Sequence, residues 1–307
     1  MITIETILRK IANTLFINVQ NMELYGLLRG KLGVALFFYH YARYSHQPSY
    51  SEFAEEYIDF VCDHLSMKSP KDFGNGLTGH AWTIHHVIES HFVDAEEDFL
   101  EEIDLIIGEM DVSSLLMELN DEIPLFSKGI YFTARKKDTY IKETLFQCEE
   151  LLEQKEMVYP MSYLNSMLYF LMKAYHSDIE AALCVKLCDA LIERIKPAIE
   201  FKMYTDTDMV TLRETIHHLK RITGIRNGCM LVKDMDIRHE SIMRSCWSSL
   251  IYGYNNLRGI KIEEINTYVD KTIRDLREQD IPFYNGLTGL GFELMMTFKN
   301  WGLINDG

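Results

Sequence analysis

Pairs of side chains that could bind a metal or transfer a proton are few in this sequence. His85 and His86 are adjacent on a predicted helix, so they do not chelate one ion as an i, i+4 pair would, and at least one is expected to be a core residue. Cys184 and Cys188 share a helix face but have no imidazole or carboxylate beside them, which favours an apolar core role. His80 is a candidate for contact with a ligand. Neither a Gly-x-Ser-x-Gly elbow nor a His-Glu-x-x-His motif occurs.

The predicted helix that carries His80, His85 and His86 belongs to a repeated segment. Asn-Gly-Leu-Thr-Gly followed by an apolar helical run occurs at 75–82 and again at 285–292, and 28–38 is a related copy. Weaker copies, which lose most of the glycines, begin near 126, 162 and 248, and a badly eroded one falls at 205–220. The copies recur about every 40 residues, a period typical of helical-pair repeats.

Two kinds of helix alternate along the chain. The repeated segments are apolar on all sides and predict inner helices that are covered on nearly every side. Segments with one apolar stripe and a charged opposite face predict outer helices at 51–65, 94–112, 138–156, 178–195 and 262–278. We therefore predict an all-α fold, a double-layered α/α barrel (toroid) of about six to seven helical-hairpin repeats in a single domain over residues 1–307. We expect no more β-structure than a small hairpin.

Glycines recur in pairs, three residues apart, at the starts of the predicted inner helices, which are expected to begin close to Gly30, Gly76 and Gly286. Such a pair lets another backbone or a ligand approach closely, and it allows a positive φ in the preceding turn. Tight packing is the expected role, because the Lys-Ser/Thr that completes a phosphate-binding loop is missing. The structural glycines are Gly30, Gly33, Gly76, Gly79, Gly286 and Gly289.

Charge and composition narrow the function classes. A formal charge of −15 without any basic block argues against nucleic-acid binding, and it favours a basic partner such as a cationic peptide or simply keeps the chain in solution. No apolar run approaches the roughly 20 residues of a membrane span, and the N-terminus does not resemble a signal peptide. The six cysteines show no Cys-x-x-Cys spacing. We expect a cytoplasmic protein with reduced thiols and no membrane span.

The recurring glycine pairs before apolar helices resemble the lanthionine synthetase C-like (LanC-like) family. The resemblance covers about residues 5–300 and is strongest at 26–41, 74–88 and 284–296. It implies a ring of seven inner helices inside seven outer ones. In active members, a zinc ion held by two cysteines and a histidine activates a peptide thiol, which adds to a dehydroamino acid and forms a thioether ring.

The zinc motifs of that family are not matched here. The nearest segment to its Cys-His-Gly motif is Cys246-Trp247-Ser248, which has Trp in place of His. Its Trp-Cys-Tyr-Gly-like motif has no counterpart, since the 205 region and the Cys229 segment both lack it. The family's Ala-His-Gly helix start corresponds to Pro160-Met161-Ser162, and a methionine is no general acid or base. We therefore predict no metal, no cofactor and no catalytic residue.

The resulting hypothesis is a zinc-free relative that binds a peptide or protein partner in a modified-peptide pathway. The ligand is expected at the mouth formed by the inner-helix starts. Two alternatives remain open: an active cyclase with an unrecognised site, and a glycan-active α/α-barrel enzyme that uses two carboxylates and aromatic residues. The candidate ligand-binding residues are Arg29, Asn75, His80, Cys246, Trp247, Tyr284 and Asn285.

Overall fold

Helices are the regular elements of this protein. The computed structural model describes residues 2–66, 68–94, 99–112, 123–154, 158–233, 235 and 237–299, and within these ranges there is no strand. The predicted all-α class is therefore confirmed for the described part of the chain.

Two compact units make up the chain, and each is described by itself. The terminal unit comprises the described residues of Met1–Ser66, His86–Asp94 and Ile237–Gly307, and the central unit those of Met67–His85 and Ala95–Asp236. Helix α4 (Leu77–Glu89) has residues in both. The single domain expected over residues 1–307 stays a prediction.

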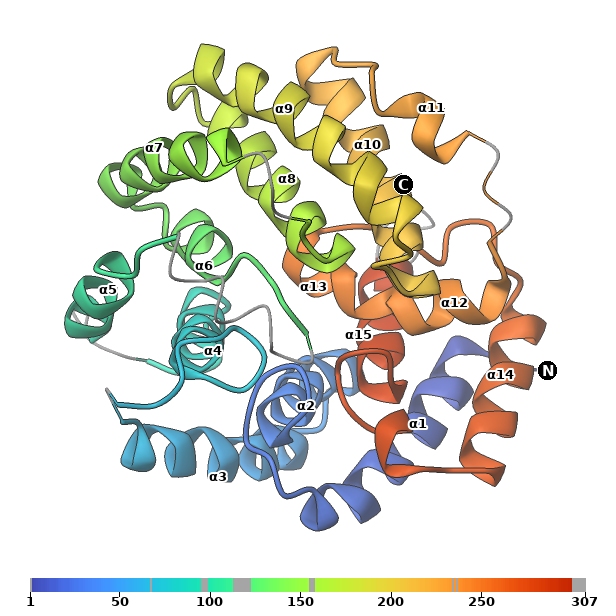
Figure 1. Ribbon diagram of the computed structural model, residues 1–307. Coiled ribbons are helices and arrows are strands. Elements are labelled where there is room, and N and C mark those ends of the chain that lie inside the picture. Colours follow the sequence, from blue (N-terminus) through green and yellow to red (C-terminus); the bar gives the residue numbers. More distant parts are fainter. Residues whose placement is uncertain are drawn as a thin grey trace, which may run out of the picture. The chain divides into compact units, whose positions relative to one another are not determined.

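The terminal unit brings the two ends of the described chain together. Helix α15 (Leu287–Lys299) packs against α1 (Ile4–Asn18) and α2 (Lys31–Ser45), so the red and blue helices lie side by side in Figure 1. Helix α3 (Ser49–His64) covers α2, and α14 (Ile262–Arg274) covers α1. A broken helical segment, α12 (His239–Arg244), η3 (Ser245–Trp247) and α13 (Ser248–Tyr252), packs against α15.

Burial separates two layers inside the terminal unit. In α2, every side chain from Lys31 to Tyr39 is buried, as expected for an inner helix. In α3, only Ala54, Tyr57, Ile58 and Val61 are buried, which is one stripe at helical spacing. The predicted inner and outer character of these two helices is thus confirmed.

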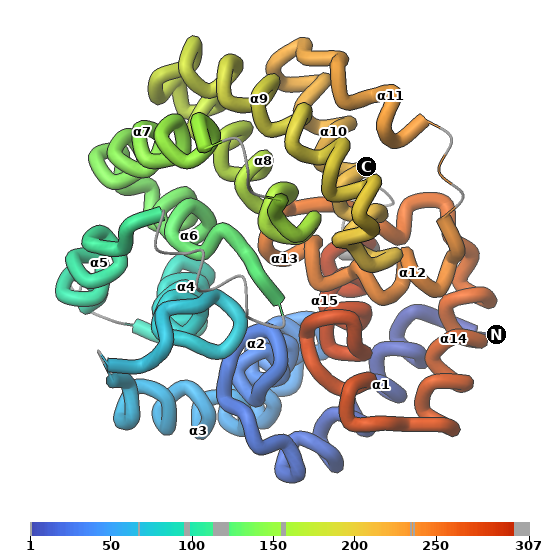
Figure 2. Tube along the Cα trace, in the orientation of Figure 1, coloured from blue at the N-terminus to red at the C-terminus, as the bar shows by residue number. Residues whose placement is uncertain are grey.

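The central unit repeats the two-layer arrangement. Helix α8 (Met161–His176) packs against α6 (Ser127–Arg135), α9 (Ala181–Glu200) and α10 (Asp206–Thr223), and α7 (Asp138–Glu153) packs against α6 and α9 (Figure 2). Every side chain of α8 from Met161 to Met172 is buried. Helix α10 occupies the eroded repeat and begins with a Thr205–Asp208 capping box. The short helix α11 (Cys229–Val232) follows it.

Helix starts agree closely with the predicted repeat starts. The seven helices α2, α4, α6, α8, α10, α13 and α15 each begin within one residue of a predicted position. The outer segment predicted at 94–112 contains the shorter helix α5 (Glu101–Gly108), and residues 95–98 of that prediction lie outside the described residues. The segment predicted at 262–278 ends earlier as a helix, at Arg274.

The paired glycines provide room for the loop that precedes each helix. A Cβ atom on Gly79 would overlap the carbonyl of Phe73, and one on Gly289 would overlap the carbonyl of Phe283. Neither glycine has a positive φ, so close backbone approach, and not backbone strain, explains them. A positive φ in the preceding turn is found at Asn285, with φ 61°, but not in the corresponding turn of the 75–82 copy.

Half-buried histidines of the terminal and central units have structural partners. His85 Nε2 lies 3.0 Å from the carbonyl oxygen of Ala134, within the central unit. His86 Nε2 lies 3.0 Å from Nε2 of His40, within the terminal unit. The adjacent histidines therefore have separate partners, as their predicted divergence requires.

Candidate binding pocket

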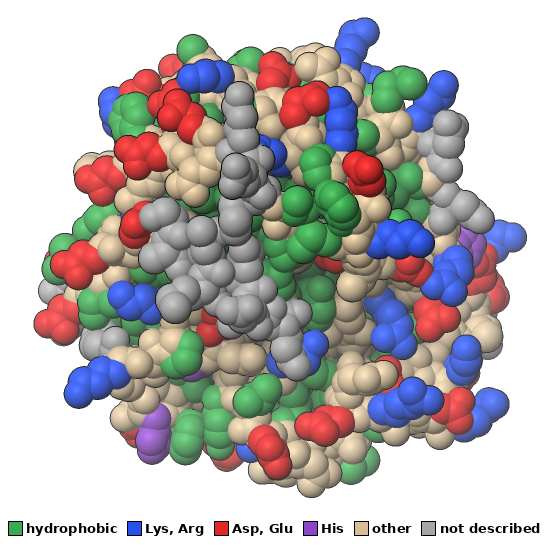
Figure 3. All heavy atoms as spheres, in the orientation of Figure 1, with side chains coloured by type: hydrophobic (Ala, Val, Ile, Leu, Met, Phe, Trp, Pro, Cys, Tyr) green, Lys and Arg blue, Asp and Glu red, His purple; other side chains and the backbone are tan. Residues whose placement is uncertain are grey.

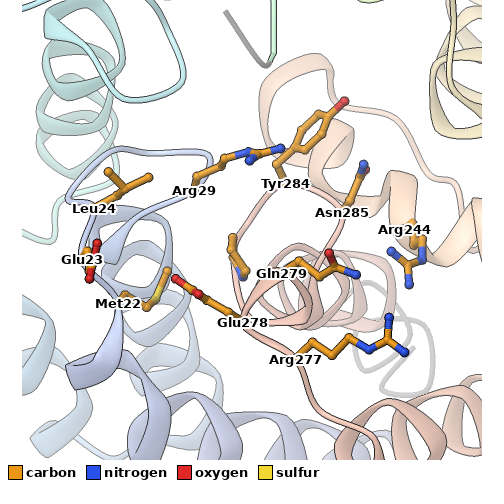
Figure 4. Close-up of a pocket in the computed structure, with 11 residues that line it drawn as sticks. Met22, Glu23, Leu24, Arg29, Arg244, Arg277, Glu278, Gln279, Tyr284 and Asn285 are labelled. Carbon is orange, nitrogen blue, oxygen red and sulfur yellow. The ribbon is translucent and has the colours of Figure 1, made fainter.

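A pocket of about 550 Å³ opens in the terminal unit (Figure 4). Its wall comes from the loop after α1, from the residue before Gly30, from the end of α12 and from the segment that leads into α15. Its volume falls in the range of ligand-binding pockets. The lining residues are Met22, Glu23, Leu24, Arg29, Arg244, Arg277, Glu278, Gln279, Pro282, Tyr284 and Asn285.

Hydrogen bonds between two loops hold one wall of the pocket in place. The Tyr284 backbone N–H donates to the carbonyl of Leu28 at 2.8 Å, which joins the segment before α15 to the loop before α2. The Lys31 N–H donates to the carbonyl of Leu24 at 3.0 Å and folds that loop back on itself. Arg29 and Tyr284 are brought into the same wall by these bonds, although they are far apart in the sequence.

The charge of the pocket differs from that of the chain. The chain carries −15, whereas the pocket is lined by three arginines and two glutamates. Arg244 has only long ion-pair distances, 3.6 Å to Glu240 and 3.6 Å to Asp280. Lys and Arg side chains are also frequent on the face shown in Figure 3 where α12 and α14 lie. A negatively charged group is therefore favoured at this pocket.

Three of the predicted binding residues, Arg29, Tyr284 and Asn285, line this pocket. Asn75 and His80 belong to the central unit, where the Asn75 N–H donates to Asp72 Oδ1 at 2.6 Å. Burial lowers the pKa of His80, against an opposing effect of Asp72. The predicted mouth shared by all of these residues stays a prediction.

Cys246 and Trp247 are buried and are not among the residues that line the pocket. Cys246 is 0% exposed, and its thiol donates to the carbonyl oxygen of Ile242 at 3.6 Å, beside the carboxyl group of Glu293. Burial raises the pKa of this thiol well above its ordinary value. The Trp247 ring packs against Tyr284 with ring centroids 5.0 Å apart, so Trp247 supports a lining residue from inside.

Glu293 is a buried acid that the sequence analysis did not single out. Its side chain is 0% exposed, and its oxygens accept hydrogen bonds from the Leu257 N–H at 2.7 Å and from Asn256 Nδ2 at 2.9 Å. Burial raises the pKa of Glu293 to about 7. The sequence offers one signal for this residue: it is a lone glutamate inside the apolar run of a predicted inner helix, where a charged group needs partners.

Cys246 and Trp247, which the sequence resemblance sets at the Cys-His-Gly motif, do not fit a zinc ion. The Cys246 thiol faces a carboxyl group with a raised pKa, and Trp247 supplies no metal-binding nitrogen. In the part of the chain that the structure describes, no group of three or more His, Cys, Asp or Glu residues is arranged to hold a metal ion. These residues therefore provide no basis for a zinc-dependent reaction step.

Comparison with known proteins adds no family assignment. The chain matches no protein-family model, and no curated protein matches it. None of the described helices combines the length and apolar character that a bilayer-spanning segment needs.

Proposed function

We propose that this chain is a zinc-free, non-catalytic relative of the LanC-like family that binds a peptide or protein partner of a modified-peptide pathway in the cytoplasm. The observation that carries the proposal is the pocket in the terminal unit, where Arg29, Tyr284 and Asn285 lie together at two helix starts. Its arginines, glutamates, glutamine, asparagine and tyrosine offer hydrogen bonds to peptide groups, and Met22, Leu24 and Pro282 offer apolar contacts.

The environment of Cys246 supports a non-catalytic role. A zinc-dependent cyclase needs thiolate and imidazole ligands with one open position. Here the thiol is buried beside Glu293, its raised pKa keeps it protonated in the ordinary pH range, and it donates to the Ile242 carbonyl. One such thiol does not hold a catalytic metal.

The first test combines metal content with peptide binding. The protein, purified without added metal, is expected to contain no stoichiometric zinc by mass spectrometry. It is also expected to retain members of a random 12-residue peptide pool during gel filtration. Cys246→Ala should retain the same peptides, because its side chain does not reach the pocket. Asn285→Gly paired with Tyr284→Ala should lose them, and glycine accepts the positive φ of residue 285.

Other outcomes of this test favour the alternatives. About one equivalent of zinc that is lost in Cys246→Ala would restore the cyclase hypothesis. The glycan-active alternative draws on Glu23, Glu278 and Tyr284, since two carboxylates and an aromatic ring line the pocket. Hydrolysis of aryl glycosides by the wild type, abolished in Glu278→Gln, would favour that enzyme over a binding protein.

We also propose that the helical hairpins close into a double-layered α/α barrel that forms one domain over residues 1–307. The seven helix starts near the predicted positions and the two layers inside each unit support this proposal. Small-angle X-ray scattering should give the distance distribution of one compact particle. A distribution with two separated maxima would contradict a closed barrel.

A further inference from the structure

Opposite charges lie at the two ends of the pocket. In Figure 4, Glu23 and Glu278 lie near Met22 at one end, while Arg244 and Arg277 lie together at the other. Such an arrangement is complementary to a ligand with an anionic group at one end and a cationic group at the other.

The charged groups at both ends are available to a ligand. Among the described residues, the Arg277 guanidinium has no carboxylate within ion-pair distance, and Arg244 has only the two 3.6 Å contacts. Glu23 and Glu278 likewise make no ion pair within the described ranges. Arg244 and Arg277 also line a neighbouring pocket of about 230 Å³, so they stand between two cavities.

A polar group without a partner lies between the charged ends. The side-chain oxygen of Asn285 is buried, and within the described structure no donor reaches it. Because this oxygen is shielded, the part of the Asn285 amide that faces the pocket is its nitrogen, a hydrogen-bond donor. Gln279 lines the same part of the pocket and offers a second amide. Two amides between charged ends suit the peptide bonds of a short peptide.

We propose that the pocket binds a short zwitterionic peptide, with its free C-terminal carboxylate on Arg244 and Arg277 and its amino group on Glu23 and Glu278. Guanidinium groups form strong, charge-assisted hydrogen bonds to carboxylates. The Asn285 side-chain N–H donates to a backbone carbonyl of the peptide. This inference rests on the proposed peptide-binding function and names the ends of the peptide that are recognised.

The test uses three pools of random tripeptides: one with free termini, one amidated at the C-terminus and one acetylated at the N-terminus. Binding is followed by the rise in melting temperature as pool concentration increases, since a ligand of the native state stabilises it. The free pool is expected to bind the wild type about tenfold more tightly than either blocked pool, because each blocked end loses charge-assisted hydrogen bonds.

Single-residue variants assign the two ends. Arg277→Gln should abolish the preference for a free carboxylate, and Glu278→Gln should abolish the preference for a free amine. Arg274→Gln and Glu263→Gln are matched controls, because both residues lie on α14 outside the pocket lining, and they should behave as the wild type. Circular dichroism of each variant before the titration checks that it is folded.

The outcomes separate this inference from the function on which it rests. Equal binding of free and blocked tripeptides, or an unchanged preference in Arg277→Gln, would overturn recognition of the termini. If the 12-residue pool still bound through Tyr284 and Asn285, the proposed partner binding would stand without recognition of the peptide termini. If no peptide of either length bound, both the inference and the proposed function would be wrong.

Discussion

Replacing Glu293 by alanine at pH 5 is expected to lower the free energy of unfolding by about 4 kcal/mol. The Leu257 N–H and the Asn256 amide would both lose their acceptor in a fully buried site, and a cavity would remain. These bonds tie α15 to the loop between α13 and α14. Glu293 lies 36 positions after Leu257 and 37 positions after Asn256 in the sequence. Urea unfolding followed by circular dichroism measures the change.

Glu293→Gln is the matched control for this effect. The glutamine keeps the side-chain volume and one oxygen for the Leu257 N–H, so we expect a loss of about 2 kcal/mol, roughly half that of alanine. Equal stability of the alanine variant and the wild type would show that the buried carboxyl group does not hold the loop.

The same residue predicts how stability depends on pH. Burial raises the pKa of Glu293 from 4.5 to about 7, so the folded protein binds this proton more tightly than the unfolded chain does. The stabilising contribution is fully present below about pH 4.5 and is lost as the pH rises through 7. Relative to Glu293→Gln, the wild type should lose about 3 kcal/mol across this window. Parallel curves for the two proteins would contradict a raised pKa.

Replacing Gly289 by leucine is expected to destabilise the protein by about 3 kcal/mol. Even the first carbon of a side chain would overlap the Phe283 carbonyl and lie 3.0 Å from the Trp247 backbone nitrogen. These are backbone atoms, which cannot move aside as a flexible side chain does. The melting temperature and the urea midpoint measure the loss.

Two further variants distinguish close backbone approach from backbone strain as the reason for glycine at these positions. Gly79→Leu should have a similar cost, because its Cβ atom would overlap the Phe73 carbonyl. Gly224→Ala is the control for backbone strain: its φ is +78° with open space around it, so we expect about 1 kcal/mol. A larger loss in Gly224→Ala than in Gly289→Leu would show that strain, and not close approach, explains the glycine requirement.

Local sequence pattern determined which segments are helices and which of them are inner. Glycines at helix starts and apolar residues on every side act over a few residues, so the starts of α2, α4 and α15 could be predicted to within one residue. Arg29, Tyr284 and Asn285 were found as candidates for the same reason, because they immediately precede such starts.

Tertiary structure alone decided how distant residues combine. Glu23, Arg244 and Arg277 come from three separate segments, and no local pattern indicates that they line one pocket. Cys246 was a candidate by its position in the repeat, yet packing buries it against Glu293, beyond the reach of a ligand in the pocket. Periodicity reports which face of a helix is buried. Which neighbour buries a residue depends on how the loops, which differ in length, direct the chain from one helix to the next. Only the folded structure defines these paths.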